Sequence, residues 1–192
     1  MDFMEILTII ALGFWLFIPA MLVNTGAVFA GKLCSVKMDF GKTWKGKRIL
    51  GDGKSWSGFI GGIAFGVFIG MMQVLLASNW DSDNYWGYGP YWDNLGIIFC
   101  LSFGGLFGDL CGAFTKRRLG LERGEKAPIL DQYDFVAGAF IITSIFYPNW
   151  VYETYFEGAN IAAFIFLLLI MWGIHRSFNI LGYKIGVKNE PW

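Results

Sequence analysis

The chain has 192 residues, and its 15 basic and 15 acidic side chains give a formal net charge of zero. Apolar residues make up 55% of the chain, aromatic residues 19% and charged residues only 16%. This composition excludes an ordinary soluble domain. No nucleic-acid partner is expected.

Charged residues are clustered, and the clustering leaves long uncharged runs. Between Glu5 and Lys32, and again between Lys54 and Asp81, lie 26 uncharged residues. A helix of that length measures about 39 Å and can cross a hydrocarbon core of about 30 Å with some tilt. The sequence therefore predicts a single-domain, all-α polytopic membrane protein over residues 1–192. Its expected spans are Ile6–Gly31, Trp56–Asn79, Leu95–Phe114, Ile129–Pro148 and Ala159–Ile174.

The basic residues predict an orientation. Seven lie between the first two spans, five between the third and fourth, and three after the fifth, which accounts for all fifteen. By the positive-inside rule this side is cytoplasmic. The N-terminus is then outside the cell membrane and the C-terminus inside. Two polar cytoplasmic loops, at about residues 32–55 and 115–128, are expected to form an active site.

The start of the chain carries Asp2 and Glu5 where a signal peptide has basic residues, so we expect the first span to be retained. The three cysteines have no metal-type spacing. We expect free thiols at Cys34, Cys100 and Cys111.

Glycines recur every four residues along the second and third spans. Such smooth stripes let helix backbones approach closely. An interface within one chain is favoured, and a homodimer stays open as an alternative. The stripes are Gly58, Gly62, Gly66 and Gly70, and then Gly104, Gly108 and Gly112.

The outer connection, residues 79–94, combines three aspartates and no cation with six tryptophans and tyrosines. Amphipathic rings at headgroup depth explain this composition without a ligand. A structural role is favoured over carbohydrate or substrate binding.

The first inner loop ends in GDGKS. A P-loop is excluded, because Arg48 stands where its first glycine belongs and no strand precedes the motif. Gly51 and Gly53 still allow unusual backbone conformations, while Lys54 and Ser55 open the second span. A helix start with free amides and a lysine can bind an anion. An ordinary glycine turn with a positive-inside lysine is an equal alternative.

Polar residues also occur within the spans, near their inner ends. Pro19 and Asn24 lie in the first span, where local repair of the helix and a wet cavity are both explanations. Asp109 lies near the inner end of the third span, where it can pair with a lysine.

The segment from Phe114 to Phe135 combines a basic run, Lys116, Arg117 and Arg118, with Asp131 and Asp134 three residues apart. Two carboxylates on one helical face repel each other unless a cation lies near. A metal-phosphate site is favoured over a salt-bridge network with the arginines.

Some chemistry is excluded. The only histidine, His175, is more readily an interfacial residue than a catalytic base. There is no Ser-His-Asp grouping and no GxSxG elbow, which argues against acyl transfer. Phosphoryl or nucleotidyl transfer requires neither, because cations do most of the electrostatic work.

Three segments together resemble the CDP-archaeol synthase family: PAMLVNTGAVFAGK, GKTWKGKRILGDGKSWSGFIGG and FGDLCGAFTKRRLGLERGEKAPILDQYDF. The last is also similar to the signature of CDP-diacylglycerol synthases, in which a basic run precedes D-x-x-D. Before the second segment only Asp39 matches the family pattern; Ser55 replaces a threonine, and Lys126 stands where a small residue or proline is usual.

The resemblance implies transfer of CMP from CTP to the phosphate of 2,3-bis-geranylgeranyl glyceryl phosphate, with release of pyrophosphate. It implies Mg²⁺ as cofactor, with Asp131 and Asp134 as its ligands, assisted by Asp109. These two acids, with Lys116 and Arg117, are the expected catalytic residues. The expected nucleotide- and phosphate-binding residues are Asn24, Gly51, Asp52, Gly53, Lys54, Ser55 and Arg118.

Two alternatives belong to other classes. A CDP-alcohol phosphotransferase is disfavoured because its D-G-x-x-A-R motif is absent. A membrane transporter or structural protein with an anion-binding cytoplasmic face explains the spans and the charge bias. It leaves the acids among the inner cations unexplained.

Overall fold

The computed structural model describes residues 2–34, 36–83, 85–122, 125 and 127–184. The predictions for Arg123, Lys126 and Lys188 fall outside these residues, and so does the side chain of His175.

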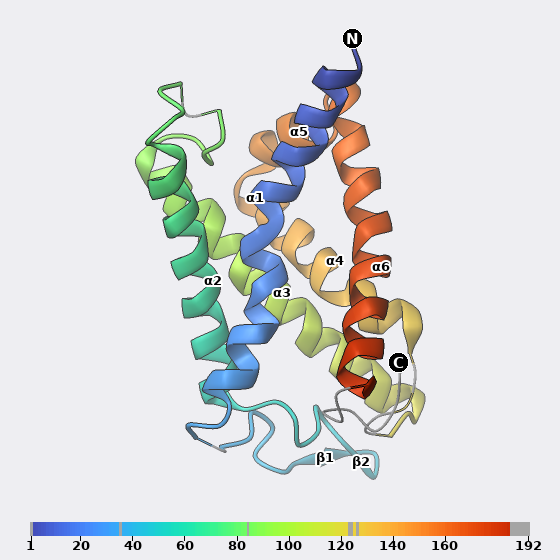
Figure 1. The fold of residues 1–192 in the computed structure, drawn as a ribbon. Helices are drawn as coiled ribbons and strands as arrows, with labels where there is room; N and C mark the ends of the chain where they lie inside the picture. Colours follow the sequence, from blue (N-terminus) through green and yellow to red (C-terminus); the bar gives the residue numbers. More distant parts are fainter. Residues whose placement is uncertain (1, 35, 84, 123–124, 126, 185–192) are drawn as a thin grey trace.

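The described chain is predominantly helical (Figure 1). Its helices are α1 (Phe3–Ala30), α2 (Trp56–Ala77), α3 (Tyr91–Leu119), α4 (Pro128–Phe146), α5 (Pro148–Tyr155), the 3₁₀ turn η1 (Gly158–Asn160) and α6 (Ile161–Lys184). Strands β1 (Thr43–Trp44) and β2 (Lys47–Arg48) pair antiparallel in the loop between α1 and α2.

Four of the helices, α1 to α4, are long and apolar enough to cross a membrane. The helix α5 together with Gly158–Gly173 makes a fifth candidate, bent by 80°. The predicted all-α polytopic fold is therefore confirmed, with one addition. Pro148 ends the fourth span and opens a separate short helix, because proline suits the first turn of a helix and interrupts its interior.

The third span is longer than predicted. Its helix runs on through the basic residues to Leu119 and ends at Gly120, whose φ of 88° is the left-handed conformation that glycine adopts readily. Lys116, Arg117 and Arg118 stand in its last turn, where cations are stabilised by the helix dipole. Residues 115–119 are thus helical, not part of a loop.

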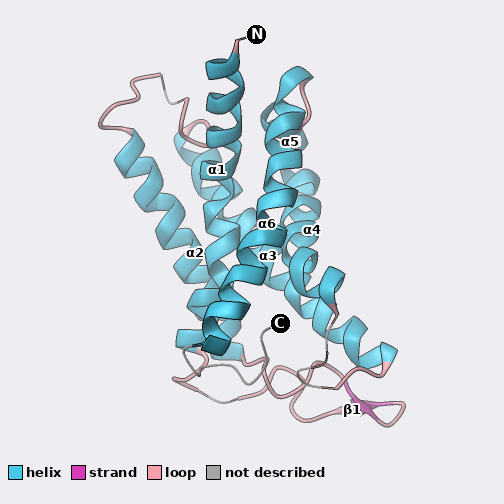
Figure 2. Ribbon diagram, turned by 45° about the vertical axis from the view of Figure 1, so that its right-hand side comes forward, coloured by secondary structure: helices cyan, strands magenta, loops and turns pink. Residues whose placement is uncertain are grey.

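The bundle has two different ends (Figures 1 and 2). The loop carrying β1 and β2, the end of α3 and the start of α4 lie at one end. The N-terminus and α5 lie at the other. The described basic residues of both inner segments therefore lie at a single end of the molecule.

Both glycine stripes form interfaces within the chain, as predicted. Gly62 of α2 faces α1, where a Cβ would lie 2.7 Å from the carbonyl oxygen of Val23. Gly104 of α3 faces α4, where a Cβ would lie 2.6 Å from the carbonyl oxygen of Gly138. The stripes are used inside one chain, so neither is available to a second copy.

The outer connection was expected to place its aromatic rings at headgroup depth. In the structure, part of the connection is buried in the protein instead. Trp80 and Trp92 are exposed, but Tyr88 is completely buried. The Tyr88 hydroxyl donates to Oε1 of Gln73 at 2.9 Å, and its amide donates to Oδ1 of Asn94 at 2.8 Å. The role remains structural, but this ring anchors the connection to the core instead of lying at headgroup depth.

Substitution of one α4 glycine tests the contact with α3. A Cβ on Gly138 would lie 2.5 Å from the Cα of Gly108, whereas one on Gly173 of α6 meets nothing within 4 Å. Alanine favours a helix over glycine by about 1 kcal/mol at either position. Gly138→Ala should nevertheless lower the melting temperature in detergent, and Gly173→Ala should not. If both substitutions changed the melting temperature equally, close packing of the α3 and α4 backbones at Gly138 would be contradicted.

Candidate active site

Two lysine–aspartate ion pairs connect three helices at the basic end of the bundle. Lys54, just before α2, pairs with Asp109 of α3. Lys116 of α3 pairs with Asp131 of α4. All four side chains are between 18% and 35% exposed. Partly buried charges of this kind are tolerated when they are paired.

Asp131 has a second contact that explains its position. Its Oδ2 accepts a hydrogen bond from the amide of Ala127 at 3.0 Å, which satisfies one of the free amides at the start of α4. The acid is therefore oriented both by its own helix and by the lysine of α3. Sequence spacing placed it beside Asp134, but its ionic partner is Lys116.

Asp134 lies where α4 touches α3. Its carboxylate stands against Gly112: a Cβ on that glycine would lie 2.8 Å from Cγ of Asp134. Its Oδ1 accepts from the amide of Phe135 at 2.7 Å. Asp109, Lys116 and Lys54 all lie within its electrostatic reach. The absence of a side chain at Gly112 provides the space that this carboxylate occupies.

The oxygen chemistry of these acids suits a hard divalent cation. Asp109 and Asp134 act on each other electrostatically, and the lysine ammonium groups already show that cations fit beside Asp109 and Asp131. Within the described residues, no three His, Cys, Asp or Glu side chains form a cluster that could hold a metal ion alone. The described residues therefore show acids that could each contribute an oxygen ligand, but no complete three-ligand metal site.

The neighbouring arginines of α3 point to different partners. The Nη1 of Arg117 donates to the carbonyl oxygen of Leu121, and its Nε is buried with no hydrogen-bond partner among the described residues. Arg118 donates to the carbonyl oxygens of Trp44 at 2.7 Å and Arg48 at 2.6 Å. Its guanidinium also lies over the Trp44 ring, 5.1 Å from the centroid. Arg118 thus attaches the β1–β2 hairpin to α3.

One of the two glycines of the GDGKS segment has a positive φ. Gly51 has a φ of 97°, while Gly53 is absent from the positive-φ residues of the described chain. Gly51 therefore uses the conformational freedom that both glycines allow, and Gly53 does not use positive φ. Ser55 caps α2, because its Oγ accepts from the amide of Gly58 at 3.1 Å. Lys54 stands immediately before this cap.

Asp52 and Asn24, the two remaining predicted contacts, take part in neither the Lys54–Asp109 nor the Lys116–Asp131 ion pair. Asp52 bonds Lys37 and Arg48 in the loop and is 47% exposed. Hydrogen bonds from Lys37 and Arg48 hold the pKa of Asp52 below its usual value. Asn24 lies in α1, partly exposed, seven residues before Gly31.

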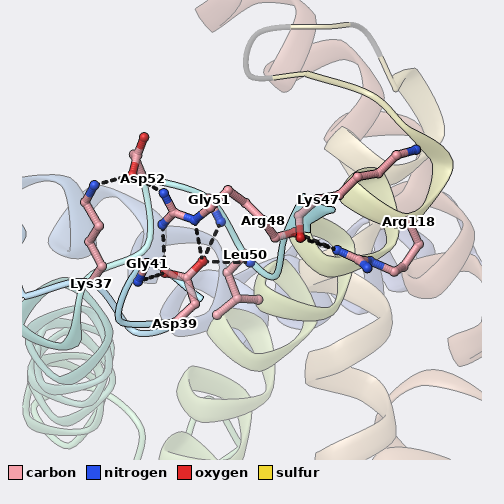
Figure 3. Close-up of polar contacts among 9 residues, drawn as sticks. All are labelled: Lys37, Asp39, Gly41, Lys47, Arg48, Leu50, Gly51, Asp52 and Arg118. Carbon is pink, nitrogen blue, oxygen red and sulfur yellow. Dashed lines mark hydrogen bonds and ion pairs between the residues drawn. The ribbon is translucent and has the colours of Figure 1, made fainter. Parts of the chain in front are cut away.

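Sequence reasoning left Asp39 without a role, and the structure makes it the centre of the first inner loop (Figure 3). Its side chain is fully buried. Burial opposes its charge, but hydrogen bonds from Arg48 and from three backbone amides outweigh this and hold the pKa of Asp39 well below its ordinary value. Only the fold could identify it, because its partners lie 2 to 12 residues further along the chain.

The lowered pKa of Asp39 predicts how stability changes with pH. Since the folded pKa lies below the unfolded value of about 3.9, the ionised carboxylate stabilises the fold above that pH, and the contribution is lost as pH falls through the folded pKa. We compare the melting temperatures of the wild type and Asp39→Asn. Their difference should stay constant from about pH 8 to 5 and narrow below about pH 4. If the difference in melting temperature already narrows near pH 6, the low pKa of Asp39 is contradicted.

Comparisons with known proteins show which family the chain resembles. A family model described as CarS-like, CDP-archaeol synthase, matches residues 6–192. A CDP-archaeol synthase of Picrophilus torridus is 44% identical over 93% of this chain and 94% of its own length. One from Archaeoglobus fulgidus is 39% identical over 93% of this chain and 95% of its own.

One solved structure is similar as well. It is described as an intramembrane enzyme for archaeal membrane lipids biosynthesis, with a TM-score of 0.58 and 33% identity. The match covers 82% of this chain and 89% of that one.

Fold and site together define a multi-pass membrane enzyme with a charged site at one end of its helix bundle. The chain belongs to the CDP-archaeol synthase family, whose members are CTP-using cytidylyltransferases of archaeal lipid biosynthesis. The suspected resemblance is confirmed, and the alternative of a non-enzymatic transporter or structural protein is wrong.

Proposed function

We propose that the protein transfers CMP from CTP to the phosphate of 2,3-bis-geranylgeranyl glyceryl phosphate in the cell membrane, giving CDP-archaeol and pyrophosphate. The observation that carries this proposal is the pair of lysine–aspartate contacts across α2, α3 and α4. Each supplies a cation for a phosphate and an acid for a metal ion at the end of apolar helices that suit lipid tails.

The cations provide the phosphate subsites. Lys54 and Lys116 turn from their aspartates to the triphosphate when CTP binds. Arg117, whose Nε has no hydrogen-bond partner among the described residues, adds a third cation beside Gly51. These charges offset the negative charge that develops on the leaving pyrophosphate. Arg118 acts through the hairpin that it holds.

The acids then become available as oxygen ligands. Asp134 and Asp131, with help from Asp109, are the residues that would hold Mg²⁺. When bound, the metal supplies Lewis-acid stabilisation of the phosphate charge. No side chain is needed as a general base, because the attacking lipid phosphate is already an anion.

The reaction is an in-line displacement. An oxygen of the lipid phosphate forms a bond to the α-phosphorus of CTP, and the bond from that phosphorus to the α–β bridging oxygen breaks. The electron pair leaves with pyrophosphate. Asn24 and Asp52 are proposed to contact the cytosine or the ribose. By the positive-inside rule, the basic end of the bundle faces the cytoplasm.

Substitution of Asp134 tests the metal site. Asp134→Asn should leave the protein folded and lower turnover by about 100-fold or more, because the neutral amide is a much weaker ligand. Pyrophosphate release from CTP, Mg²⁺ and the phosphorylated lipid measures this. Asp83→Asn, in the outer connection, is the matched control. Normal turnover by Asp134→Asn would remove this acid from the site; no turnover by the wild type would overturn the proposed function.

If Lys54 and Lys116 leave their aspartates to contact the CTP phosphates, the metal ion and CTP should each increase the affinity for the other. CTP should raise the affinity for Mn²⁺, used as a spectroscopic probe, by about tenfold or more in the wild type, since binding frees Asp109 and Asp131 from their lysines. Lys54→Gln should bind Mn²⁺ more tightly without CTP and show weaker coupling. Lys42→Gln, an exposed loop lysine, is the control. Independent binding of metal and CTP would contradict the exchange.

A further inference from the structure

The first inner loop is built around one buried carboxylate (Figure 3). Asp39 accepts hydrogen bonds through both of its oxygens. Oδ1 accepts from the amide of Gly41 at 3.0 Å and from Nη2 of Arg48 at 2.8 Å. Oδ2 accepts from the amides of Leu50 and Gly51, each at 3.1 Å, and from Nε of Arg48 at 3.3 Å. The carboxylate therefore holds the entire turn that precedes Lys54.

The segments before and after this turn are joined directly. The amide of Met38 donates to the carbonyl oxygen of Lys54 at 2.9 Å, and the amide of Trp56 donates to that of Val36 at 3.0 Å. The neighbour of Asp39 is thus bonded to the backbone of the lysine that pairs with Asp109. A displacement of the turn is transmitted to Lys54 through these bonds.

The same turn packs against the end of α3. Gly51, with its φ of 97°, approaches the guanidinium of Arg117, and a Cβ at this glycine would lie 3.3 Å from Nε. The amide of Gly51 is one of those that Asp39 holds. Two of the proposed phosphate-binding cations, Lys54 and Arg117, are therefore adjacent to the segment that Asp39 organises.

The charge of Asp39 is required, not only its shape. Every partner of its side chain is an N–H donor. An ionised carboxylate has two acceptor oxygens, whereas the amide of asparagine has one acceptor oxygen and two donor hydrogens. In Asp39→Asn, the amide nitrogen would face N–H donors on one side of the cluster. Those donors would be left buried without an acceptor.

We propose that Asp39 is a positioning residue of the nucleotide site, which fixes the Gly51 turn and thereby sets Lys54 and Arg117 for the triphosphate. This inference rests on the proposed function. It differs from a general stabilising role because the turn it holds adjoins the proposed phosphate subsites and not the apolar helix faces. Loss of Asp39 should therefore affect CTP far more than the lipid.

The experiment compares full-length wild type, Asp39→Asn and the control Asp83→Asn in detergent. Asp39→Asn should raise the KM for CTP by about tenfold or more, as expected from the loss of hydrogen bonds to a charged group. The KM for the lipid should stay within about twofold. Amide hydrogen exchange of residues 48–54 should quicken in the same variant. Asp83→Asn should match the wild type in all three measurements.

The outcomes separate the two proposals. An inactive wild type would overturn the function itself. An active wild type with an unchanged KM for CTP in Asp39→Asn would overturn only the positioning role, as would equal increases in both KM values.

Arg48→Lys covers the case in which Asp39→Asn does not fold. Lysine keeps the charge but cannot reproduce the forked contact of arginine with the carboxylate. It should raise the KM for CTP in the same direction by a smaller factor. A rise confined to the lipid KM, or no rise, would contradict the positioning role.

Discussion

The close approach of α3 and α4 is the constraint on which the rest of the site depends. Gly104 and Gly108 face Gly138 with no side chain between the backbones. Helices in a membrane gain little from the hydrophobic effect, so packing of this kind is what holds them together. At such a separation Lys116 reaches Asp131, and the carboxylate of Asp134 enters the space left at Gly112. Bulkier residues along this stripe would separate the acids from the cations.

Charge compensation follows from that proximity. Carboxylates at the end of membrane helices are costly unless a cation neutralises them. Lys54 and Lys116 supply this neutralisation within the bundle. In the proposed reaction, a triphosphate with its metal ion would bring charges of both signs to replace these internal partners. The ion pairs that neutralise the acids are thus the contacts that the proposed function would exchange.

Features with a long-range pattern were predictable from the sequence. Uncharged runs predicted the spans, clustered cations predicted the shared end of the described parts of the two inner segments, and four-residue spacing predicted the glycine interfaces. Features that depend on one local geometry were not. The hairpin turns through Lys45 and Gly46, whose φ values of 51° and 75° are both positive, as in a type I′ turn. The usual Asn-Gly signal is missing, because lysine occupies the first position.

Asp39 is another residue whose role depends on local geometry and could not be predicted from the sequence. One aspartate in a polar loop has many plausible partners, and its neighbours Lys37 and Lys42 are nearer in sequence than Arg48. Its actual donors come together only when the hairpin has formed and the chain has returned to Gly51. The acid was visible in the sequence, but the contacts that define its role are tertiary.

The basic run of α3 could not be assigned for a related reason. Successive residues on a helix point in directions about 100° apart, so three consecutive cations cannot all face one ligand. Lys116 is directed to Asp131 of α4, and Arg118 to the carbonyl oxygens of the hairpin. Arg117 lies between them, beside Gly51. The helical continuation to Leu119 thus divides one charged motif among three contacts: the α3–α4 interface, the Gly51 turn and the β1–β2 hairpin.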